Sequence, residues 1–441
     1  MIKADFFRIP FLLILFLIWG NQSFSQKLYT KRSTFYTHLG VSGAKLNQFN
    51  QMLEERGLSE LRNKYHSIGL GYQSRINDFV IGMELIHNRG SYSEFDGYKM
   101  GFRTSRALLN IGYAFTEESK FQLIHYMSLG VGYLNFQMLP SERPSSLESF
   151  LEDPEKGFIL RKNDIQKGSR NYGDFLTEIG FQLSYDFDIP GREEALSVIA
   201  KMGYAFSPFE GKWQMNGLSF DNTQSGAFFR VGAGISLPDR NFFYKDASIS
   251  AHLITGFHFT SPKKFNSILS DHGYDELDGT PSNLGLKIQG ENEKLLYGAE
   301  VYNLAMKGDA SSTQTQSLNS LRIYANLGYK ALQYKNFGFG ATGGIGYGNL
   351  RYTILKNDKP DFPELFEQRK FDGYLKNSGL MAKPEVFVEY AIPMTKMKLF
   401  DLVFTAAAGY ELALANYRLG ELDMADYMTA PYLMFGIGVR P

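Results

Sequence analysis

The sequence predicts an all-β chain that crosses a membrane as an antiparallel up-and-down β-barrel. Three observations predict this fold. Side-chain character alternates with a period of two along most of the chain, short and long connections alternate between the resulting strands, and the pattern of the first half recurs in the second. Period-two alternation places one set of side chains on each face of a strand. Short turns at one end and long loops at the other are typical of transmembrane barrels.

The recurrence has a constant offset of 216 residues. Gly-Met-Glu at 82–84 returns as Gly-Ala-Glu at 298–300, and the Phe-Asn pair at 49–50 returns at 265–266. A fixed period of this length predicts a tandem duplication of a unit of roughly 200 residues.

The first 25 residues are expected to be a cleaved signal peptide. Lys3 and Arg8 precede an apolar run from Ile9 to Trp19, and small and polar residues follow to Ser25. The run is too short to cross a bilayer, which needs about 20 apolar residues. No later stretch reaches that length, so the sequence predicts no membrane-spanning helix.

Eight strands are expected in the first half, beginning at Thr34, and each sets large apolar residues against small or polar ones. In one of them Ile68, Leu70 and Tyr72 oppose Gly69 and Gly71. Many of the apolar faces end in Tyr or Phe, as aromatic residues do at bilayer interfaces. Eight further strands are expected near 247–258, 282–290, 294–306, 316–331, 336–353, 378–391, 397–413 and 429–440.

The connections sort by length. Long connections are predicted at 43–63, 90–98, 138–170 and 208–224, and again at 260–281, 307–315, 354–377 and 414–428. The others are short, and 237–246 joins the two halves. Since alternate connections lie at the same end of an up-and-down barrel, all long loops are predicted to share one end.

Composition excludes several classes of protein. The 441 residues hold 46 basic and 46 acidic side chains and no cysteine. A neutral chain gives no electrostatic reason to expect nucleic acid as a partner, and no disulfide can contribute to the fold. Aromatic residues reach 15%, and the chain has 44 glycines, both typical of curved, strand-rich structures.

On these features the chain resembles bacterial outer-membrane β-barrel proteins, especially outer-membrane protein A and its eight-stranded relatives. The resemblance covers about 34–440 in two copies, and glycine-alternating strands such as 229–235 and 433–439 carry it. It implies a location in the bacterial cell outer membrane, with the lipid bilayer as partner. One departure is the C-terminus, which ends Arg440-Pro441 where that class usually ends in an aromatic residue.

Two closures fit the repeats. We predict a single 16-stranded barrel, formed jointly by an eight-strand repeat at 26–240 and another at 241–441, because a free edge on either half would pair with the other. The alternative is two tandem 8-stranded barrels, each filled by its own side chains. The glycine-rich inward faces, as at 338–348, suit the narrower form.

Charged side chains on the inward faces are the candidate site. They could line a pore and select ions by charge, or pair in a salt-bridge network that plugs the lumen. These lumen-lining candidates are Glu84, Arg106, Glu178, Lys201, Glu300, Arg322 and Glu385. His38 and His252 are also predicted to face inward, where we expect packing or hydrogen bonding rather than metal ligation.

The predicted function is a passive porin-like channel for small polar solutes. The alternative is a plugged structural or adhesion barrel whose long loops bind a partner without transport. Those loops are 43–63, 138–170, 260–281 and 354–377. No nucleophile elbow, phosphate loop or spaced metal-ligand motif occurs, so we predict neither an enzyme nor a cofactor or metal site. The sequence leaves oligomeric state and solute open.

Overall fold

We describe the protein from a computed structural model of the whole chain. The structure describes residues 31–116, 120–142, 146–161, 175–190, 195–207, 213–215, 218–220, 224–237, 247–260, 262–360, 362–393 and 401–440. The predicted signal peptide lies outside these residues.

The first half of the chain forms a closed ring of eight antiparallel strands. Around the ring the order is β1, β2, β3, β5, β6, β8, β9 and β12, and β12 pairs with β1. Two short strands of the loops add to this sheet, and two others pair only with each other. The ring strands are β1 (Lys31–Gly43), β2 (Lys64–Ile76), β3 (Phe79–Gly90), β5 (Tyr98–Ala114), β6 (Phe121–Pro140), β8 (Phe175–Asp188), β9 (Ala195–Phe206) and β12 (Gly226–Leu237). The short ones in the loops are β4 (Ser93–Phe95), β7 (Phe158–Arg161), β10 (Trp213–Met215) and β11 (Leu218–Phe220).

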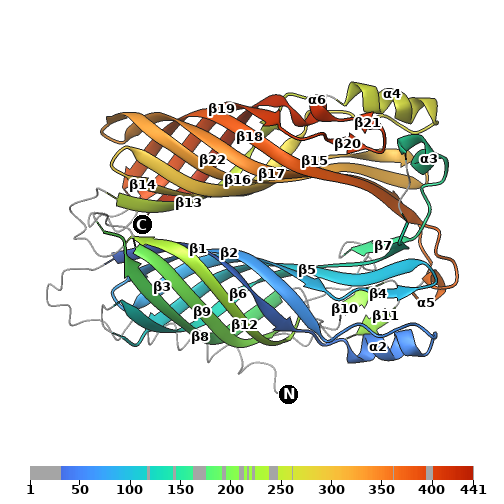
Figure 1. Cartoon of the computed structure of the whole chain (residues 1–441), viewed down its shortest axis with the longest axis horizontal. Helices are drawn as coiled ribbons and strands as arrows, with labels where there is room; N and C mark the ends of the chain where they lie inside the picture. The colour runs from blue at the N-terminus through green and yellow to red at the C-terminus, as the bar shows by residue number, and fades with distance from the viewer. Residues whose placement is uncertain are drawn as a thin grey trace, which may run out of the picture.

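The second half forms another closed eight-stranded barrel with the same order of neighbours. Its last strand, β22, pairs with its first, β13. The ring strands are β13 (Ala247–His258), β14 (Ser282–Asn292), β15 (Leu295–Ser311), β16 (Gln314–Tyr334), β17 (Phe337–Lys356), β18 (Asp372–Pro393), β19 (Asp401–Ala413) and β22 (Ala430–Arg440). Its loops add β20 (Arg418–Leu419) and β21 (Leu422–Asp423). The two barrels lie side by side (Figure 1).

The prediction of a single 16-stranded barrel formed by both halves is therefore wrong. In such a ring β1 would pair with β22, but each of them pairs within its own half. The prediction assumed that each half would leave a free edge. Because the first and last strands of each half pair with each other, no free edge needs the other half as its partner.

Inward glycines make the narrow ring possible. At Gly71 on β2 an added Cβ atom would lie 2.2 Å from the Tyr36 ring of β1, so only glycine leaves room for that ring. Tyr36 is fully buried and lies inside the lumen. Eight strands enclose a space that side chains can fill, and large inward rings need small neighbours to fit there.

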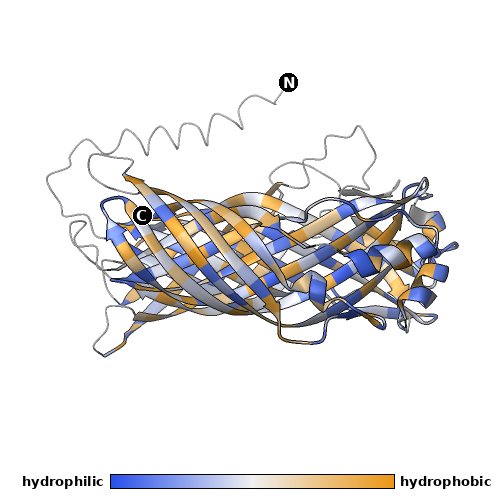
Figure 2. Cartoon of the chain, turned by 90° about the horizontal axis from the view of Figure 1, so that it is seen from above, coloured by the Kyte–Doolittle hydropathy of each residue, from blue (hydrophilic) through white to orange (hydrophobic). Residues whose placement is uncertain are grey.

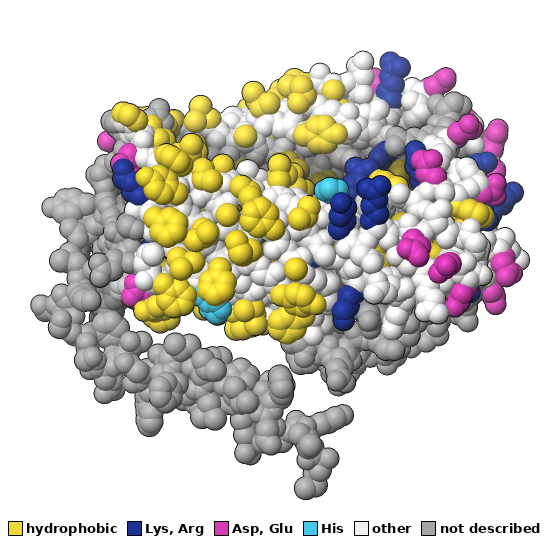
Figure 3. Space-filling view, turned by 60° about the horizontal axis from the view of Figure 1, so that its bottom comes forward, with side chains coloured by type: hydrophobic (Ala, Val, Ile, Leu, Met, Phe, Trp, Pro, Cys, Tyr) yellow, Lys and Arg dark blue, Asp and Glu magenta, His cyan; other side chains and the backbone are white. Residues whose placement is uncertain are grey.

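The outer faces of the strands form an apolar belt. Leu39, Ile111 and Leu327 are each 56–63% exposed, as are many other large apolar side chains on these faces. Apolar and polar residues alternate along the strands in Figure 2. In Figure 3 hydrophobic side chains gather over the left and middle of the molecule, and charged side chains gather toward the right. Among the described residues no helix is long and apolar enough to cross a membrane. An outward belt around a closed ring matches the lipid-facing surface of a transmembrane barrel.

Long loops and helices gather at one end of both barrels (Figure 1). One predicted long loop, 307–315, is instead mostly strand, since β15 and β16 extend to a tight connection at 312–313. The helices of this end are α2 (Asn47–Glu54), α3 (Leu147–Glu152), α4 (Lys263–Asp271), α5 (Phe362–Leu365) and α6 (Ala425–Met428). We call this the loop end, and the opposite one the short-turn end.

Helices α2 and α4 occupy equivalent positions and are held in the same way. The side chain of Asn50 in α2 donates to Leu61 O and accepts from Leu61 N, at 2.8 and 3.0 Å. Asn266 in α4 makes the same two bonds with Leu277, at 3.0 and 3.2 Å. These pairs differ by 216 residues, so the recurring letters correspond to a recurring local structure. Descent of the two halves from one unit stays a prediction.

Each barrel is capped in part by a loop of the other. Helix α3 belongs to the first half, yet Phe150 and Leu151 pack in the apolar cluster over the second barrel. The Phe150 ring lies 6.1 Å from the ring of Tyr352, and Tyr274 donates to Leu151 O at 2.9 Å. Glu155 also receives hydrogen bonds from second-barrel side chains, including Gln314 at 3.1 Å. The first half thus helps to close the second barrel.

The exchange is reciprocal. Leu365 and Phe366, at the end of α5 in the second half, pack in the apolar cluster over the first barrel. The Phe366 ring meets the Phe158 ring edge to face, with 5.5 Å between centroids. Arg369 pairs with Asp96 of the first half at 3.2 Å. The two crossing loops therefore join the barrels at the loop end.

A buried carboxylate holds the loops of the two halves together where they exchange. Asp372 is fully buried, and its two oxygens accept from Ile159 N at 2.6 Å and Lys356 N at 2.9 Å. Lys359 supplies the cation, with Nζ 2.8 Å from the carboxylate, and donates to Ile159 O at 2.7 Å. Asp372 and Gly157 also pair through their backbones. One side chain thus links β7 of the first half to β17 and β18 of the second.

Closure of each half predicts which strand neighbours crosslink. The chain has no native cysteine, so Thr255→Cys with Phe435→Cys places a single pair across β13 and β22. Both side chains point outward, and we expect rapid disulfide formation, measured as a mobility shift on a denaturing gel. The control pair, Leu39→Cys with Phe435→Cys, tests the junction of a 16-stranded ring. Crosslinking of the control pair alone would overturn the two-barrel topology.

Removing the carboxylate at the crossing should loosen the loop end without opening the rings. Asp372→Ala leaves Lys359 and two backbone amides without their buried partner, at a cost of about 3–5 kcal/mol. We expect faster amide hydrogen exchange at 157–161, with the ring strands still protected. The control is Asp358→Ala, an exposed carboxylate of the same loop. Equal exchange rates in the two variants would contradict this role for Asp372.

Candidate functional site

The predicted inward charges of the first barrel lie in its lumen and come together in two groups. In the first group Glu84 of β3 accepts from Lys201 Nζ of β9 at 2.8 Å and from the Tyr36 hydroxyl at 2.9 Å. His38 Nε2 lies 3.5 Å from the same carboxylate. The ammonium also lies over the Tyr126 ring, 4.1 Å from its centroid. The cation therefore has both a carboxylate and an aromatic face as partners.

The second group of the first barrel is centred on Glu178 of β8. Arg106 donates to it at 2.8 Å, and Arg230 of β12 binds both carboxylate oxygens, at 2.7 and 2.8 Å. Arg106 also donates to the side chain and the backbone carbonyl of Gln224, at 3.1 and 2.7 Å. Two guanidinium groups thus share one carboxylate inside a ring of eight strands.

In the second barrel Glu300 and Glu385 are joined through a lysine that the sequence reasoning missed. Lys383 contacts the Glu300 carboxylate and lies 3.2 Å from Glu385. Lys287 and the Tyr432 hydroxyl also donate to Glu385, at 3.0 and 2.8 Å. The two predicted carboxylates therefore belong to one buried network.

Arg322, the remaining predicted residue, lies in another network of the second barrel. Its guanidinium forms an ion pair with Glu411 of β19. Tyr324 and Tyr302 donate to the same carboxylate, the former at 2.6 Å, and His258 Nδ1 lies 2.9 Å from it. Across these two networks three carboxylates, of Glu300, Glu385 and Glu411, face three cations, of Lys287, Lys383 and Arg322. Formal charge therefore cancels.

A further group lies toward the short-turn end of the second barrel. Glu389 accepts from Lys330 at 2.7 Å and from Arg440 at 3.0 Å, and Lys330 also reaches Glu291 at 2.6 Å. His252 lies in the same lumen, is 3% exposed, and has its Nε2 2.8 Å from Ser250 Oγ. The geometry around His252 is that of a hydrogen-bonded lumen residue. Among the described residues no three His, Asp or Glu side chains come together as metal ligands.

Sequence reasoning missed Arg230, Lys383 and Glu411, although the signal for each was present. Arg230 lies two residues before Gly232, so period two places both on the same face of the strand. Lys383 lies two residues before Glu385, so period two gives both the same face. Glu411 lies two residues after the lumen-facing Gly409. Looking for further charged residues along each inward face would have identified all three.

Comparisons with known proteins found only distant similarity to this chain. No family model and no curated protein matches it. Among solved structures, the attachment invasion locus protein Ail of Yersinia pestis, solved with the heparin analogue sucrose octasulfate, is 13% identical with a TM-score of 0.26. That match covers 44% of this chain and 97% of Ail.

Two further structures match over most of the chain. A Pseudomonas aeruginosa FadL homologue is 11% identical with a TM-score of 0.24, covering 95% of this chain and 90% of its own. The Ralstonia pickettii toluene transporter TbuX is 6% identical with a TM-score of 0.20, covering 94% and 90%. Similarity this low transfers no function. What the arrangement can do has to be derived from its own buried charges.

Loss of one shared carboxylate should destabilise the first barrel strongly. Glu178→Gln leaves Arg106 and Arg230 facing a neutral amide in a buried space, and we expect the free energy of unfolding to fall by about 3–5 kcal/mol. Urea unfolding in lipid vesicles, followed by circular dichroism, measures it. Glu60→Gln, at an exposed loop carboxylate, is the matched control and should change stability by less than about 0.5 kcal/mol. Similar losses in both variants would contradict the network.

Proposed function

We propose that the protein acts in a bacterial outer membrane as a pair of sealed barrels, without a diffusion pore. Its loop end faces outward and its short-turn end faces the periplasm, as loop lengths do in this class. Function then resides in the outer surfaces of the barrels and in the loops. Export through a signal peptide at 1–25 is part of this proposal.

Burial of the lumen charges carries the proposal. The seven predicted lumen residues are each only 0–4% exposed, and each pairs with an opposite charge. A water-filled pore would leave such groups hydrated and available to passing ions. Removing one partner of a buried ion pair costs about 3–5 kcal/mol, so opening a path through these networks is unfavourable. This favours the plugged barrel over the porin-like channel.

The loop end supports a role in binding a partner outside the cell. Helices cover the barrels at this end, and the equivalent helices α2 and α4 expose different charges. Around α2 the exposed ends include Glu54 and Glu55, whereas α4 begins with exposed Lys263 and Lys264. An extracellular partner held by loops 43–63, 138–170, 260–281 or 354–377 fits this architecture.

Planar-bilayer recording tests the sealed lumens. We expect purified, folded protein to insert without discrete ion-conducting steps, while a porin prepared in the same way conducts. Reproducible openings whose ion selectivity changes in Lys201→Gln would overturn the proposal, because that lysine would then line a conducting path.

A further inference from the structure

The two barrels contact each other at two levels and leave a gap between them. Toward the short-turn end Tyr72 of the first barrel packs against Ala251 and Ile288 of the second and is only 6% exposed although it faces outward. At the loop end the Gly157–Asp372 pairing joins them. A cavity of about 800 Å³ is lined by residues of both barrels.

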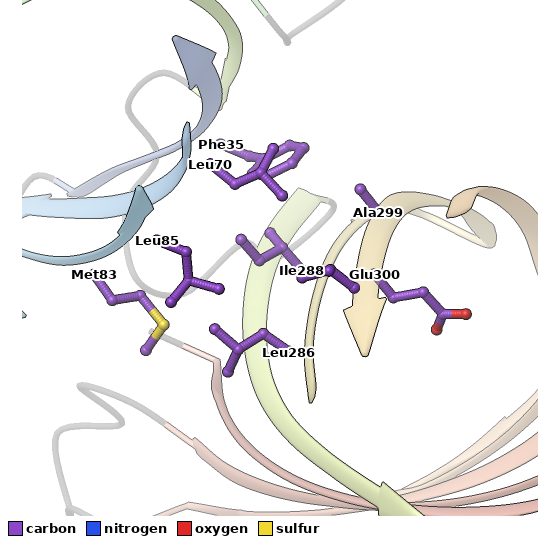
Figure 4. A pocket seen from close by; sticks show the side chains of 9 residues that line it. Phe35, Leu70, Met83, Leu85, Leu286, Ile288, Ala299 and Glu300 are labelled. Atoms are coloured by element: carbon purple, nitrogen blue, oxygen red, sulfur yellow. The ribbon is translucent and has the colours of Figure 1, made fainter. Parts of the chain in front are cut away.

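Within the hydrophobic belt, the gap between the two barrels is lined by apolar side chains. There a small pocket is walled by outward side chains of both barrels (Figure 4). The pocket-lining apolar residues are Phe35, Leu70, Met83 and Leu85 from the first barrel and Leu286, Ile288, Ala299 and Val301 from the second. Leu39 and Ile68, which line the larger cavity, continue the faces of Phe35 and Leu70. Phe35 and Leu39 are four residues apart on β1, a span of about 13 Å, and Thr37 lies between them on the same face.

The larger cavity is cationic toward the loop end. Four of its lining residues are basic, Arg89, Lys99, Arg103 and Lys376, and one, Glu94, is a carboxylate. Lys99 pairs with Glu94 at 3.1 Å. Among the residues that line the cavity, basic side chains outnumber acidic ones by three. Lys and Arg side chains gather at the edge of the hydrophobic belt in Figure 3.

Tyr92 holds two of these cations in place. Arg103 donates to its hydroxyl at 2.5 Å, and the Arg89 guanidinium lies over its ring, 4.8 Å from the centroid. Burial raises the pKa of Tyr92, but hydrogen bonding and charge from Arg103, together with the charge of Arg89, outweigh it and lower the pKa. Both arginines therefore favour negative charge at this point of the cavity.

Two buried polar atoms in the same wall have no hydrogen-bond partner in the described structure. One is Oε1 of Gln137, a residue only 4% exposed that lines the cavity. The other is Nε of Arg103. Buried polar groups are nearly always satisfied in proteins. The Gln137 oxygen can accept from a ligand hydroxyl, and the Arg103 N–H can donate to a ligand oxygen. The Arg103 N–H suits a phosphate oxygen.

We propose that the gap between the barrels binds one anionic, phosphate-bearing lipid of the outer leaflet. Its phosphate binds Arg89 and Arg103, and its acyl chains lie along Leu39 and Ile68 toward the apolar pocket. Orientation with the loop end outward comes from the proposed function. A soluble phosphate or sulfated sugar could use the same cations but would leave the apolar wall uncovered. The continuity of that wall with the belt is why a lipid fits best.

Native mass spectrometry of the full-length protein in detergent tests the site. The probes are a short-chain phosphatidic acid, phosphatidylcholine of the same acyl length, and inorganic phosphate. We expect one phosphatidic acid to remain bound, with weaker retention of the other two. Arg89→Gln with Arg103→Gln should weaken it by about tenfold or more, since both substitutions remove charge-assisted hydrogen bonds to the phosphate.

Controls separate loss of the site from loss of the fold. Arg418→Gln removes an exposed cation elsewhere at the loop end and should not change binding. Arg89→Lys with Arg103→Lys keeps the charges and should retain most of it, and circular dichroism checks each variant for folding. Ile68→Ser tests the apolar wall and should weaken the lipid but not inorganic phosphate.

Two results would overturn the lipid assignment. One is phosphatidic acid binding that is unchanged in the double Gln variant. The other is inorganic phosphate or a sulfated polysaccharide binding as tightly as the lipid, with no effect of Ile68→Ser. Neither result bears on the sealed lumens, because the conductance measurement tests those separately.

Discussion

Pairing of every strand edge is the constraint on which this structure depends. In hydrocarbon an unpaired backbone group costs several kcal/mol, so a membrane sheet has to close. Here closure occurs twice, through β1 with β12 and through β13 with β22. Two rings of eight strands are narrow, so their interiors fill with side chains. Because the lumens are filled, the proposed functions lie on the lipid-facing and loop surfaces of the barrels.

Buried charge inside these rings follows from the same constraint. A narrow lumen has little room for water, so each inward charge needs an opposite partner nearby. Glu178 meets two guanidinium groups, and Lys383 meets two carboxylates. These networks also cross the lumen between strands far apart in sequence, such as β3 and β9 through Glu84 and Lys201. Ion pairing therefore links opposite sides of each barrel across its lumen.

Sequence alone predicted the inward and outward faces well, because period-two alternation is a local property. It placed all seven charged candidates in the lumens, with Glu84 and Lys201 in mutual contact. Ring closure could not be predicted in the same way, since β1 carries the same alternation whether β12 or β22 is its neighbour. The packing of α3 and α5 on the barrel of the other half could not be predicted from the sequence either. Nothing in the local sequence around Phe150 or Phe366 indicates which barrel receives these side chains.

A cryo-electron-microscopy map of the protein in a lipid nanodisc is the most direct test of the central claim that each half closes and seals its own ring. We predict two separate eight-stranded rings in cross-section, with side-chain density across the lumens at Glu178 and at Glu411. A single ring of sixteen strands around continuous solvent would contradict it.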